Sequence, residues 1–448
     1  MNRRTTVIAA LIAIAAAGRA GAQESLSRKD FLASLQRVGL DADGSWWLSV
    51  AGHARYRGEG WHGYSFGGPA TADPNDSYSL GRFFLSVDVH AGNTFRALVE
   101  GKSSIASDRT LVGGRRTSDE DALDLQQAFV ELTVPAGPAR LSVRAGRQEL
   151  ALGRERLVTS GDWNNTRKTF EGFTGRLAVG NWAVQGLFVA PVIVQSYAFN
   201  QRDQHTLLYG AYATNPRIAD RTGLDLYWLG VRRDTVVVAG TGGREVRHTV
   251  GARLWYASAA PGLDYEVETA RQFGTLGAHA INAWMAAGVL GATVSAAALA
   301  PRVYVGADYA SGDVAAGGRV GTFSQLFGTA HRFHGYMDVN GGQNLVDWTA
   351  GASVKWLGVT GFALDLHRFD RASRGDVFYS ATLTTSRAAG SGLARHIGDE
   401  LDVTVRYPFG RHVLTALGYG HYIPGLFVRQ TGMSKAMDFT YLSTQFTL

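Results

Sequence analysis

The sequence predicts an all-β protein that folds as a single transmembrane, antiparallel, up-and-down β-barrel of about eighteen strands. Three features support this prediction. Apolar and polar side chains alternate along many segments, short and long connections alternate between those segments, and the composition suits strands and turns. The 448 residues include 56 Gly, 17 Tyr and 10 Trp but no Cys, and this balance of glycine and aromatic residues favours strands over helices.

The strands are predicted from a period of two residues, because successive side chains of a strand point to opposite faces of the sheet. Phe83 and Leu85, for example, share one face, while Arg82 and Asp88 share the other. The same pattern recurs in 94–102, 246–254, 347–356 and 400–407. One strand departs from it: the segment 224–231, "LDLYWLGV", is apolar on both faces.

The connections between these segments indicate a membrane barrel and not a soluble sandwich. Short turns fall at 92–93, 135–138, 180–181, 357–358 and 408–411. Long polar loops fall between them, at 57–78, 105–121, 151–168, 192–204, 312–345, 371–395 and 423–436. Outer-membrane barrels have this asymmetry, with short periplasmic turns and longer extracellular loops. We therefore expect a barrel of the Gram-negative outer membrane with both chain ends in the periplasm, in which the longest loop caps the pore or folds into it.

The first 22 residues have the pattern of a secretory signal peptide. Arg3 and Arg4 form a basic start, an apolar stretch covers 7–17, and the small residues "AGA" at 20–22 form a cleavage site. Removing this segment takes away three Arg and no acidic residue, which leaves 41 basic against 38 acidic residues and a formal charge of +3. That charge is too small to indicate binding of nucleic acid.

Residues 23–45 are predicted to form a periplasmic lead, and the barrel is predicted to occupy 46–448. Within the lead, apolar residues recur at helical spacing after Ser27, a suitable helix N-cap, so a short helix is expected over 25–39. This lead either plugs the pore or is disordered or loosely attached outside it, and the sequence leaves both possibilities open.

The segment 280–300 carries no charge over 21 residues, which is long enough for a transmembrane helix. However, it consists mostly of Ala and Gly, and period-two patterns lie on both sides of it. We therefore interpret it as strand and turn, in keeping with the rest of the barrel.

The sequence gives little sign of an enzyme or of a metal or cofactor site. It contains no H-E-x-x-H motif and no Walker loop. Asp308, Asp313 and Asp338 flank or lie in the longest loop, but they lack the ligand spacing of an EF-hand. His331 and His334 in the same loop have no further ligands near them in the sequence. We therefore expect no catalytic residues, no metal site and no cofactor.

Several stretches of the chain resemble the alginate export family of outer-membrane barrels. In order along the chain they include "RLSVRAGRQELALGRERLV" (140–158), "RKTFEG" (167–172), "DYASGDVAAGGRVGTFSQLF" (308–327), "IGDELDVTVRYPF" (397–409) and "LGYGHYIPGLFVRQTG" (417–432). The resemblance runs from about residue 46 to the last residue. It implies an eighteen-stranded monomeric barrel, and in the best-known member an electropositive pore conducts an anionic polysaccharide.

The charges expected to face the lumen are more balanced than a strongly cationic pore would require. The polar faces of the predicted strands place there Arg82, Asp88, Arg96, Glu100, Arg253, Asp402 and Arg406. The near balance of signs is a departure from the family pattern, and it indicates that any preference for anions arises at a local constriction.

The hairpin 144–168 is the candidate for that constriction. Its charged residues are Arg144, Arg147, Glu149, Arg154, Arg156, Arg167 and Lys168. An inward-folded basic loop would hold anions through bidentate arginine contacts, whereas a solvated external loop would only form ordinary ion pairs. Arg147 falls on the apolar face of its strand, so either Gly146 marks a β-bulge or Arg147 lies above the membrane.

The sequence therefore predicts an outer-membrane channel for passive passage of a hydrophilic solute that is anionic or sugar-like, polysaccharides included. The alternatives are an uptake porin for small organic acids or aromatic compounds, and a structural or enzymatic barrel. The expected partners are outer-membrane lipid, the solute and the barrel assembly machinery, and the expected state is a monomer. In the last strand, Phe446 is expected to face lipid and to serve as the terminal apolar anchor.

Overall fold

Eighteen antiparallel strands form one closed barrel, as the alternating sequence pattern predicts. The computed structural model describes residues 35–448 apart from 69–72, 239, 259–260, 296–298 and 315–317. The barrel strands are β2 (Trp46–His62), β3 (Asp76–Ala91), β4 (Phe95–Ala106), β5 (Asp121–Ala136), β6 (Ala139–Gln148), β7 (Phe170–Val179), β8 (Trp182–Ile193), β10 (Thr206–Ala219), β11 (Thr222–Val238), β12 (Thr241–Tyr256), β13 (Gly262–Leu276), β14 (His279–Thr293), β15 (Arg302–Ala310), β16 (Leu345–Trp356), β17 (Val359–Arg371), β20 (His396–Phe409), β21 (Val413–Pro424) and β22 (Met437–Thr447).

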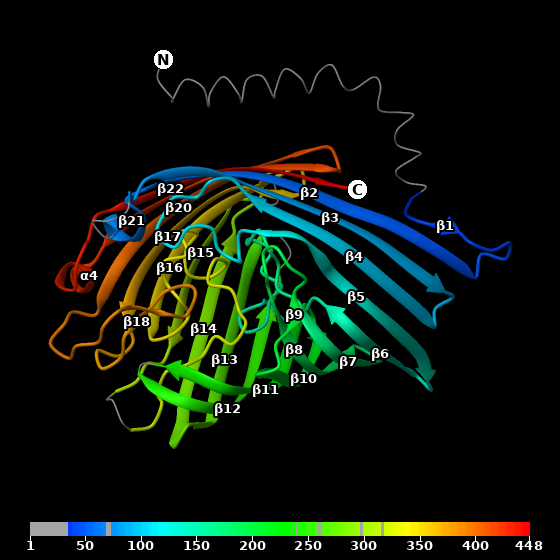
Figure 1. Cartoon of the computed structure of the whole chain (residues 1–448), viewed down its shortest axis with the longest axis horizontal. Coiled ribbons are helices and arrows are strands. Elements are labelled where there is room, and N and C mark those ends of the chain that lie inside the picture. The colour runs from blue at the N-terminus through cyan, green and yellow to red at the C-terminus, as the bar shows by residue number, and fades with distance from the viewer. Residues whose placement is uncertain (1–34, 69–72, 239, 259–260, 296–298, 315–317) are drawn as a thin grey trace, which may run out of the picture.

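The barrel closes because its last strand pairs with its first (Figure 1). Leu442 of β22 is the register partner of Gly58 of β2, and each of the other barrel strands pairs with the next barrel strand along the chain. Closure satisfies the backbone donors and acceptors within the wall, which a membrane-spanning sheet requires because lipid offers no hydrogen bonds.

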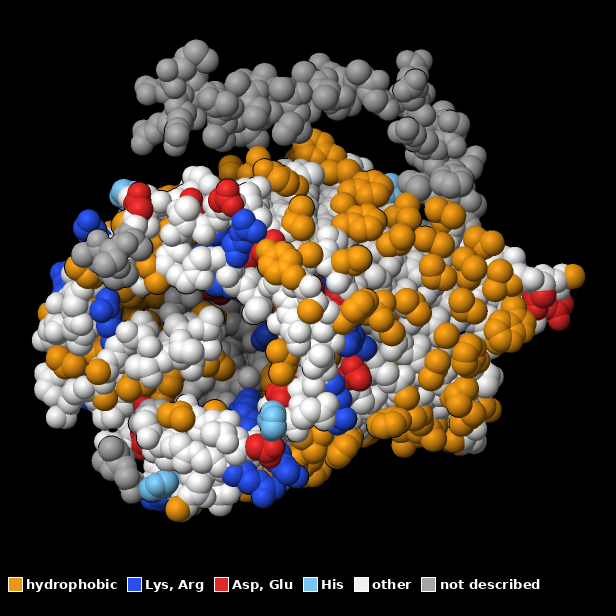
Figure 2. Space-filling model, in the orientation of Figure 1, with side chains coloured by type: hydrophobic (Ala, Val, Ile, Leu, Met, Phe, Trp, Pro, Cys, Tyr) orange, Lys and Arg blue, Asp and Glu red, His pale blue; other side chains and the backbone are white. Residues whose placement is uncertain are grey.

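The two faces of the wall differ as the period of two predicts. On β3, Phe83 is 51% and Leu85 46% exposed on the outer face, whereas Arg82 is 2% and Phe84 1% exposed on the inner face. On β22, Phe446 is also exposed on the outer face. Figure 2 shows hydrophobic side chains gathered on the outer wall toward the right-hand end, where Figure 1 shows short turns.

The long loops lie at one end of the barrel and most short turns at the other (Figure 1). The strands extend further than their apolar pattern indicated, so that the predicted loop 57–78 shrinks to 63–75. Two hairpins are exceptions to the alternation, since only two residues separate β11 from β12, and β13 from β14, at the long-loop end. The long loops also contain the short helices and strands α3 (Tyr64–Gly67), α4 (Leu426–Gln430), β9 (Gln201–Arg202), β18 (Phe378–Tyr379) and β19 (Thr385–Arg387).

Two expectations concerning helices are corrected or limited by the structure. The predicted helix over 25–39 lies mostly outside the described residues, as does the predicted signal peptide. At its end, Val38–Gly39 forms the short strand β1, paired with Trp47 and Leu48, so the helix does not reach residue 39. The uncharged segment 280–300 contributes β14, as interpreted from its flanks, and no helix among the described residues is long and apolar enough to cross a membrane.

Apolar side chains inside the barrel form clusters beneath the long loops. The largest cluster joins wall residues such as Leu229 and Met285 to loop residues such as Leu157, Val158 and Phe323. This packing explains the segment 224–231. Its odd-numbered residues from Tyr227 onward are buried under the loops, while Leu226 and Trp228 are exposed on the outer wall.

Candidate functional site

Two long loops fold into the lumen and join each other there. They are loop 149–169, between β6 and β7, and loop 311–344, between β15 and β16. The backbone N–H of Phe327 donates to the carbonyl of Leu157 at 2.9 Å, and the N–H of Thr159 donates to the carbonyl of Phe327 at 3.2 Å. Val158 and Phe327 are thereby bridged in parallel. The longest loop therefore folds into the pore, one of the two placements the sequence allowed.

Loop 149–169 is held against the barrel wall by arginines of β2 and β3. Arg55 donates to the carbonyl of Asp162 at 2.8 Å, and Arg57 donates to that of Trp163 at 2.6 Å. Arg82 donates to the carbonyl of Asp162 at 2.9 Å and to its carboxylate at 2.8 Å. All three arginines are buried. Their charges are therefore engaged mainly by carbonyl groups of this loop.

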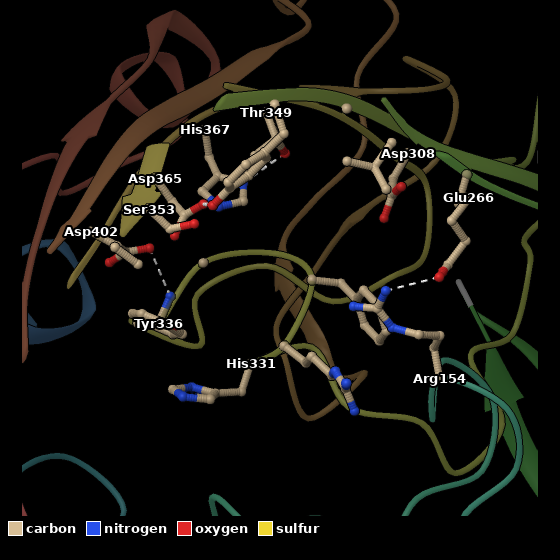
Figure 3. A pocket seen from close by; sticks show the side chains of 18 of the residues that line it. Arg154, Glu266, Asp308, His331, Tyr336, Thr349, Ser353, Asp365, His367 and Asp402 are labelled. Carbon is tan, nitrogen blue, oxygen red and sulfur yellow. Dashed lines mark hydrogen bonds and ion pairs between the residues drawn. The ribbon is translucent and has the colours of Figure 1, made fainter. Parts of the chain in front are cut away.

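Loop 311–344 is held by carboxylates of β20. The N–H of Tyr336 donates to Asp402 Oδ2 at 3.0 Å, as Figure 3 shows, and the N–H of Met337 donates to Glu400 Oε1 at 2.9 Å. His334 of the same loop lies 3.3 Å from the carboxylate of Asp347 on β16. Asp402 was expected to face the lumen, and there it binds the loop backbone.

The joined loops separate two chambers of the lumen. One, of about 620 Å³, lies among loop residues 154–156 and 331–336 and strands β13 to β20. The other, of about 450 Å³, extends toward the long-loop end and is lined by β2, β3 and parts of several loops. Loop residues His331 and Tyr336 line both chambers, so these two rings lie between the chambers.

Aromatic rings from both loops stack at this junction. The rings of Trp163 and His331 are 3.9 Å apart and nearly parallel, and those of His331 and Tyr336 are 4.9 Å apart. The guanidinium of Arg57 lies 3.8 Å over the ring of Trp163, a distance that suits a cation–π interaction. The stack therefore connects the wall, loop 149–169 and loop 311–344.

Basic residues of the predicted selectivity hairpin are distributed over both chambers. Arg154 and Arg156 line the larger chamber, where Arg154 pairs with Glu266 at 2.8 Å and Arg156 with Asp308. Lys168 lines the smaller chamber and donates to the carbonyls of Phe327 at 3.2 Å and Gly328 at 2.9 Å.

The remaining hairpin residues make local pairs. Arg167 pairs with Glu149 at 2.5 Å within loop 149–169. Arg144 lies on β6 and pairs with Glu131 of β5 at 2.7 Å. The structure therefore brings Arg154 and Arg156 together and leaves Arg144 apart from them.

Arg147 lies near the end of β6, beside Gly146. Gly146 pairs in unbroken register with Phe129 and Gly172, so the suggested bulge at Gly146 is wrong. Arg147 pairs with Asp124 at 2.7 Å and donates to the carbonyl of Asn200 at 2.9 Å. Arg147 therefore holds the loop that follows β8 over this end of β6.

The other predicted lumen charges lie in pairs along the inner wall. Asp88 and Arg96 are 2.8 Å apart, and Glu100 accepts a hydrogen bond from Gln127 at 3.3 Å. Arg253 bridges Asp225 at 2.9 Å and Glu266 at 2.8 Å. Arg406 lines the larger chamber, and it makes no ion pair among the described residues.

Burial shifts the pKa values of two groups in loop 149–169. Burial lowers the pKa of the Lys168 ammonium to about 8. Burial raises the pKa of Glu149 above its usual value, although Arg167 opposes that shift. The charge of Lys168, a cationic group of the smaller chamber, is therefore sensitive to mildly alkaline pH.

The sequence interpretation missed the residues that loop 311–344 contributes. These are Tyr336, Arg332, whose side chain is 45% exposed and pairs with Glu155 at 3.2 Å, and His331, which was considered only as a metal ligand. A signal was present, since "HRFHGY" at 331–336 concentrates basic and aromatic residues in the longest loop. Asp308, considered only as a metal ligand, instead pairs with Arg156.

A glycine-rich stretch at the end of β2 carries two patterns that resemble enzyme motifs. Residues 58–63 fit G-x-G-x-x-G and residues 63–67 fit G-x-S-x-G. The first runs from the end of β2 into α3, but α3 is a single turn with left-handed φ at Ser65 and Phe66, and not the long helix whose N-terminus would bind a dinucleotide. Ser65 has a left-handed φ of 55° but makes no side-chain hydrogen bond to a histidine among the described residues, and a nucleophile requires such a base.

Comparisons with solved structures agree with this architecture. The structure of Pseudomonas aeruginosa OpdO has a TM-score of 0.58 at 13% identity, and the match covers 90% of this chain and 97% of that one. P. aeruginosa OpdK with vanillate has a TM-score of 0.58 at 14% identity, covering 89% and 98%. P. aeruginosa OccK2 (OpdF) in complex with glucuronate has a TM-score of 0.59 at 11% identity, covering 90% and 98%.

Sequence comparison identifies the family. No curated protein matches the chain. The family described as alginate export matches residues 46–441, nearly the whole barrel. The chain therefore belongs to the alginate export family and is a channel-type β-barrel of the Gram-negative outer membrane.

Proposed function

We propose that this barrel is a monomeric channel for passive diffusion of small, hydrophilic carboxylates, such as sugar acids and organic acids. The solute enters the smaller chamber from the long-loop end, passes the rings of His331 and Tyr336, and leaves through the larger chamber. The two joined loops support a small solute over a thick polymer, because they cross the lumen and leave chambers of about 620 and 450 Å³.

The accessible arginines of the larger chamber carry this proposal. Most acidic groups there are already engaged: Glu266 by Arg154 and Arg253, Asp308 by Arg156, and Asp402 by the Tyr336 N–H. In contrast, Arg154 and Arg332 keep 40% and 45% of their side-chain surface exposed. Together with Arg406, they offer guanidinium groups to a passing carboxylate, which is the anion that arginine binds in bidentate geometry.

The related barrels give independent support for this solute class. The OpdK structure contains vanillate and the OccK2 structure contains glucuronate, and both molecules are small carboxylates. A passage lined by partly exposed arginines would select for such solutes at short range, where the narrow, poorly hydrated pore weakens screening.

Reversal potentials in planar bilayers test the proposal. In a salt gradient of potassium gluconate, the parent channel should prefer the anion. The triple variant Arg154→Gln, Arg332→Gln and Arg406→Gln should lose that preference, by about threefold or more in the permeability ratio. Arg368→Gln is the matched control, because Arg368 lies exposed on β17 among the residues that do not line the chambers. An unchanged ratio in the triple variant would contradict the proposal.

A further inference from the structure

Three basic residues form a diagonal row on the outer wall of the barrel, away from the pore. Arg232 of β11 is the register partner of Val246, and His248 of β12 is the partner of Gly230 and Phe273. Arg271 of β13 is the partner of Val250. Successive members of the row are therefore diagonal neighbours on adjacent strands, with about 7–8 Å between them.

The three side chains face outward. The residues beside them in sequence are buried on the inner face, with Val231, Arg247 and Gln272 all 0% exposed. Because side chains alternate along a strand, Arg232, His248 and Arg271 project toward the membrane and its surface.

The row lies at the level of the outer membrane surface. Arg232 lies ten residues after the periplasmic end of β11, and Arg271 lies nine residues after the periplasmic end of β13. On β12, which runs the other way, His248 lies eight residues before the periplasmic end. A tilted strand crosses the hydrocarbon core in about 9–11 residues. Trp284, the neighbour of Arg271 on β14, stacks on Tyr309 at 4.4 Å, and such aromatic pairs are typical of the membrane interface.

His248 and Arg271 carry N–H groups that can donate hydrogen bonds toward the outside of the barrel. His248 Nδ1 lies 3.3 Å from the indole N–H of Trp228 and accepts its hydrogen bond, which leaves the proton on Nε2. Arg271 is exposed and makes no ion pair or hydrogen bond among the described residues. At the membrane surface Arg271 can meet an anionic lipid group, which its apolar neighbours such as Val250 and Phe273 do not offer.

Arg232 borders a shallow pocket that extends the row toward the extracellular side. The pocket has a volume of about 190 Å³, and Arg202 and His205 also line it. Asp234 lies 3.5 Å from Arg232 and 3.2 Å from His205, and Asp203 is the other carboxylate there. The basic groups therefore outnumber the acids along the whole row, since Arg271 and His248 have no carboxylate beside them in the register.

We propose that Arg232, His248 and Arg271 bind the phosphate groups of a phosphorylated glycolipid of the outer leaflet. Arg232 and Arg271 flank the site at its two ends and His248 donates from Nε2 between them. A headgroup with two phosphates on a sugar backbone fits this spacing, and its acyl chains would lie against the apolar wall below. The lipid would fix the rim formed by β11 to β14, where β11 and β12, and β13 and β14, are each joined by a short connection.

Lipid binding by the folded protein in detergent tests the proposal. Native mass spectrometry would measure retention of bis-phosphorylated lipid A, with fully dephosphorylated lipid A as the probe lacking phosphate. The variant Arg232→Gln, His248→Gln and Arg271→Gln should retain at least about fivefold less of the phosphorylated lipid. Arg368→Gln is the matched control, because Arg368 is an exposed outer-wall arginine whose nearest charges are Asp370 at 3.6 Å and Asp399 at 3.8 Å; it should bind as the parent does.

Three outcomes would overturn the proposal: equal retention by the triple variant, equal retention of the dephosphorylated lipid, or full displacement of the lipid by millimolar inorganic phosphate. Resistance of each variant to dodecyl sulfate before boiling shows that the barrel has folded. Conductance of the triple variant should equal that of the parent, because the row lies outside the pore. Failure of lipid binding is thereby separated from failure of the channel.

Discussion

Two regions of the inner wall hold the two infolded loops by opposite chemistry. On β2 and β3, Arg55, Arg57 and Arg82 donate to carbonyl groups of loop 149–169. On β20, Glu400 and Asp402 accept from backbone N–H groups of loop 311–344. Both regions stabilise a loop through hydrogen bonds to its backbone, and in the first region the donors are charged guanidinium groups. The charged residues of the inner wall therefore serve first to hold the loops. The selectivity of the pore does not follow from counting positive and negative residues on that wall.

Replacing the arginines of the first region should have the largest effect. The variant Arg55→Gln, Arg57→Gln and Arg82→Gln removes charged donors, each worth about 1.5–3 kcal/mol, from three successive carbonyls. Loop 149–169 should detach from β2 and β3, and single-channel conductance should rise by about threefold. A parent-like conductance in a barrel that still resists dodecyl sulfate would mean that other contacts hold this loop.

Replacing the carboxylates of the second region should have a smaller effect. Glu400→Ala with Asp402→Ala removes two acceptors, but loop 311–344 keeps anchors elsewhere. Gln272 donates to the carbonyl of Ser324 at 2.8 Å and accepts from its N–H at 2.8 Å. Conductance should rise by less than about twofold. A larger increase than in the arginine variant would reverse the ranking of the two regions.

Alkaline pH should have the smallest effect, through Lys168. This ammonium is charged below its pKa of about 8 and neutral above it, so the anion preference should fall slightly between pH 7 and pH 9. Because the unfolded chain keeps the ordinary lysine value of 10.5, the folded loop binds fewer protons between about 8 and 10.5, and the free energy of unfolding rises with pH in that window. In Lys168→Met, the reversal potential should not change between pH 7 and pH 9. A change as large as the parent's would mean that another group loses its proton in this range.

The fold could be predicted from the sequence because a membrane barrel repeats one local rule. The outward Phe83 and Leu85 and the inward Arg82 follow from the period of two alone. Boundaries were less certain where strands leave the membrane. Arg57 and Glu59 were assigned to a loop, because "RGEGWH" at 57–62 lacks apolar alternation, yet β2 continues to His62.

The site was only partly predictable, because it depends on contacts between distant segments. The basic hairpin was recognised from its charge density, but the aromatic ring that stacks on Trp163 comes from His331, and no local pattern relates the two positions. The segment 224–231 did carry a trace of the tertiary structure. Its apolar inner face, with Leu229 and Val231 0% exposed, is the face that loop residues such as Leu157 and Phe323 cover inside the barrel.

The central claim is that loops 149–169 and 311–344 join inside the lumen to form the constriction. A cysteine pair tests it directly, since the chain has no cysteine of its own. Val158→Cys with Phe327→Cys places two thiols at bridged positions, within the separation of about 4.4–6.8 Å between Cα atoms that disulfides accept. The pair Val158→Cys with Val314→Cys is the control. Val314 lies near the start of loop 311–344, well before Phe327, and is 82% exposed.

The decisive measurement is single-channel conductance of the Val158→Cys, Phe327→Cys pair combined with the Arg55, Arg57 and Arg82 substitutions. Oxidation should form the disulfide and return the conductance to the parent value, and reduction should restore the high conductance. The control pair should show neither change. If oxidation forms no disulfide, or forms it without lowering the conductance, the joined loops do not constrict the pore.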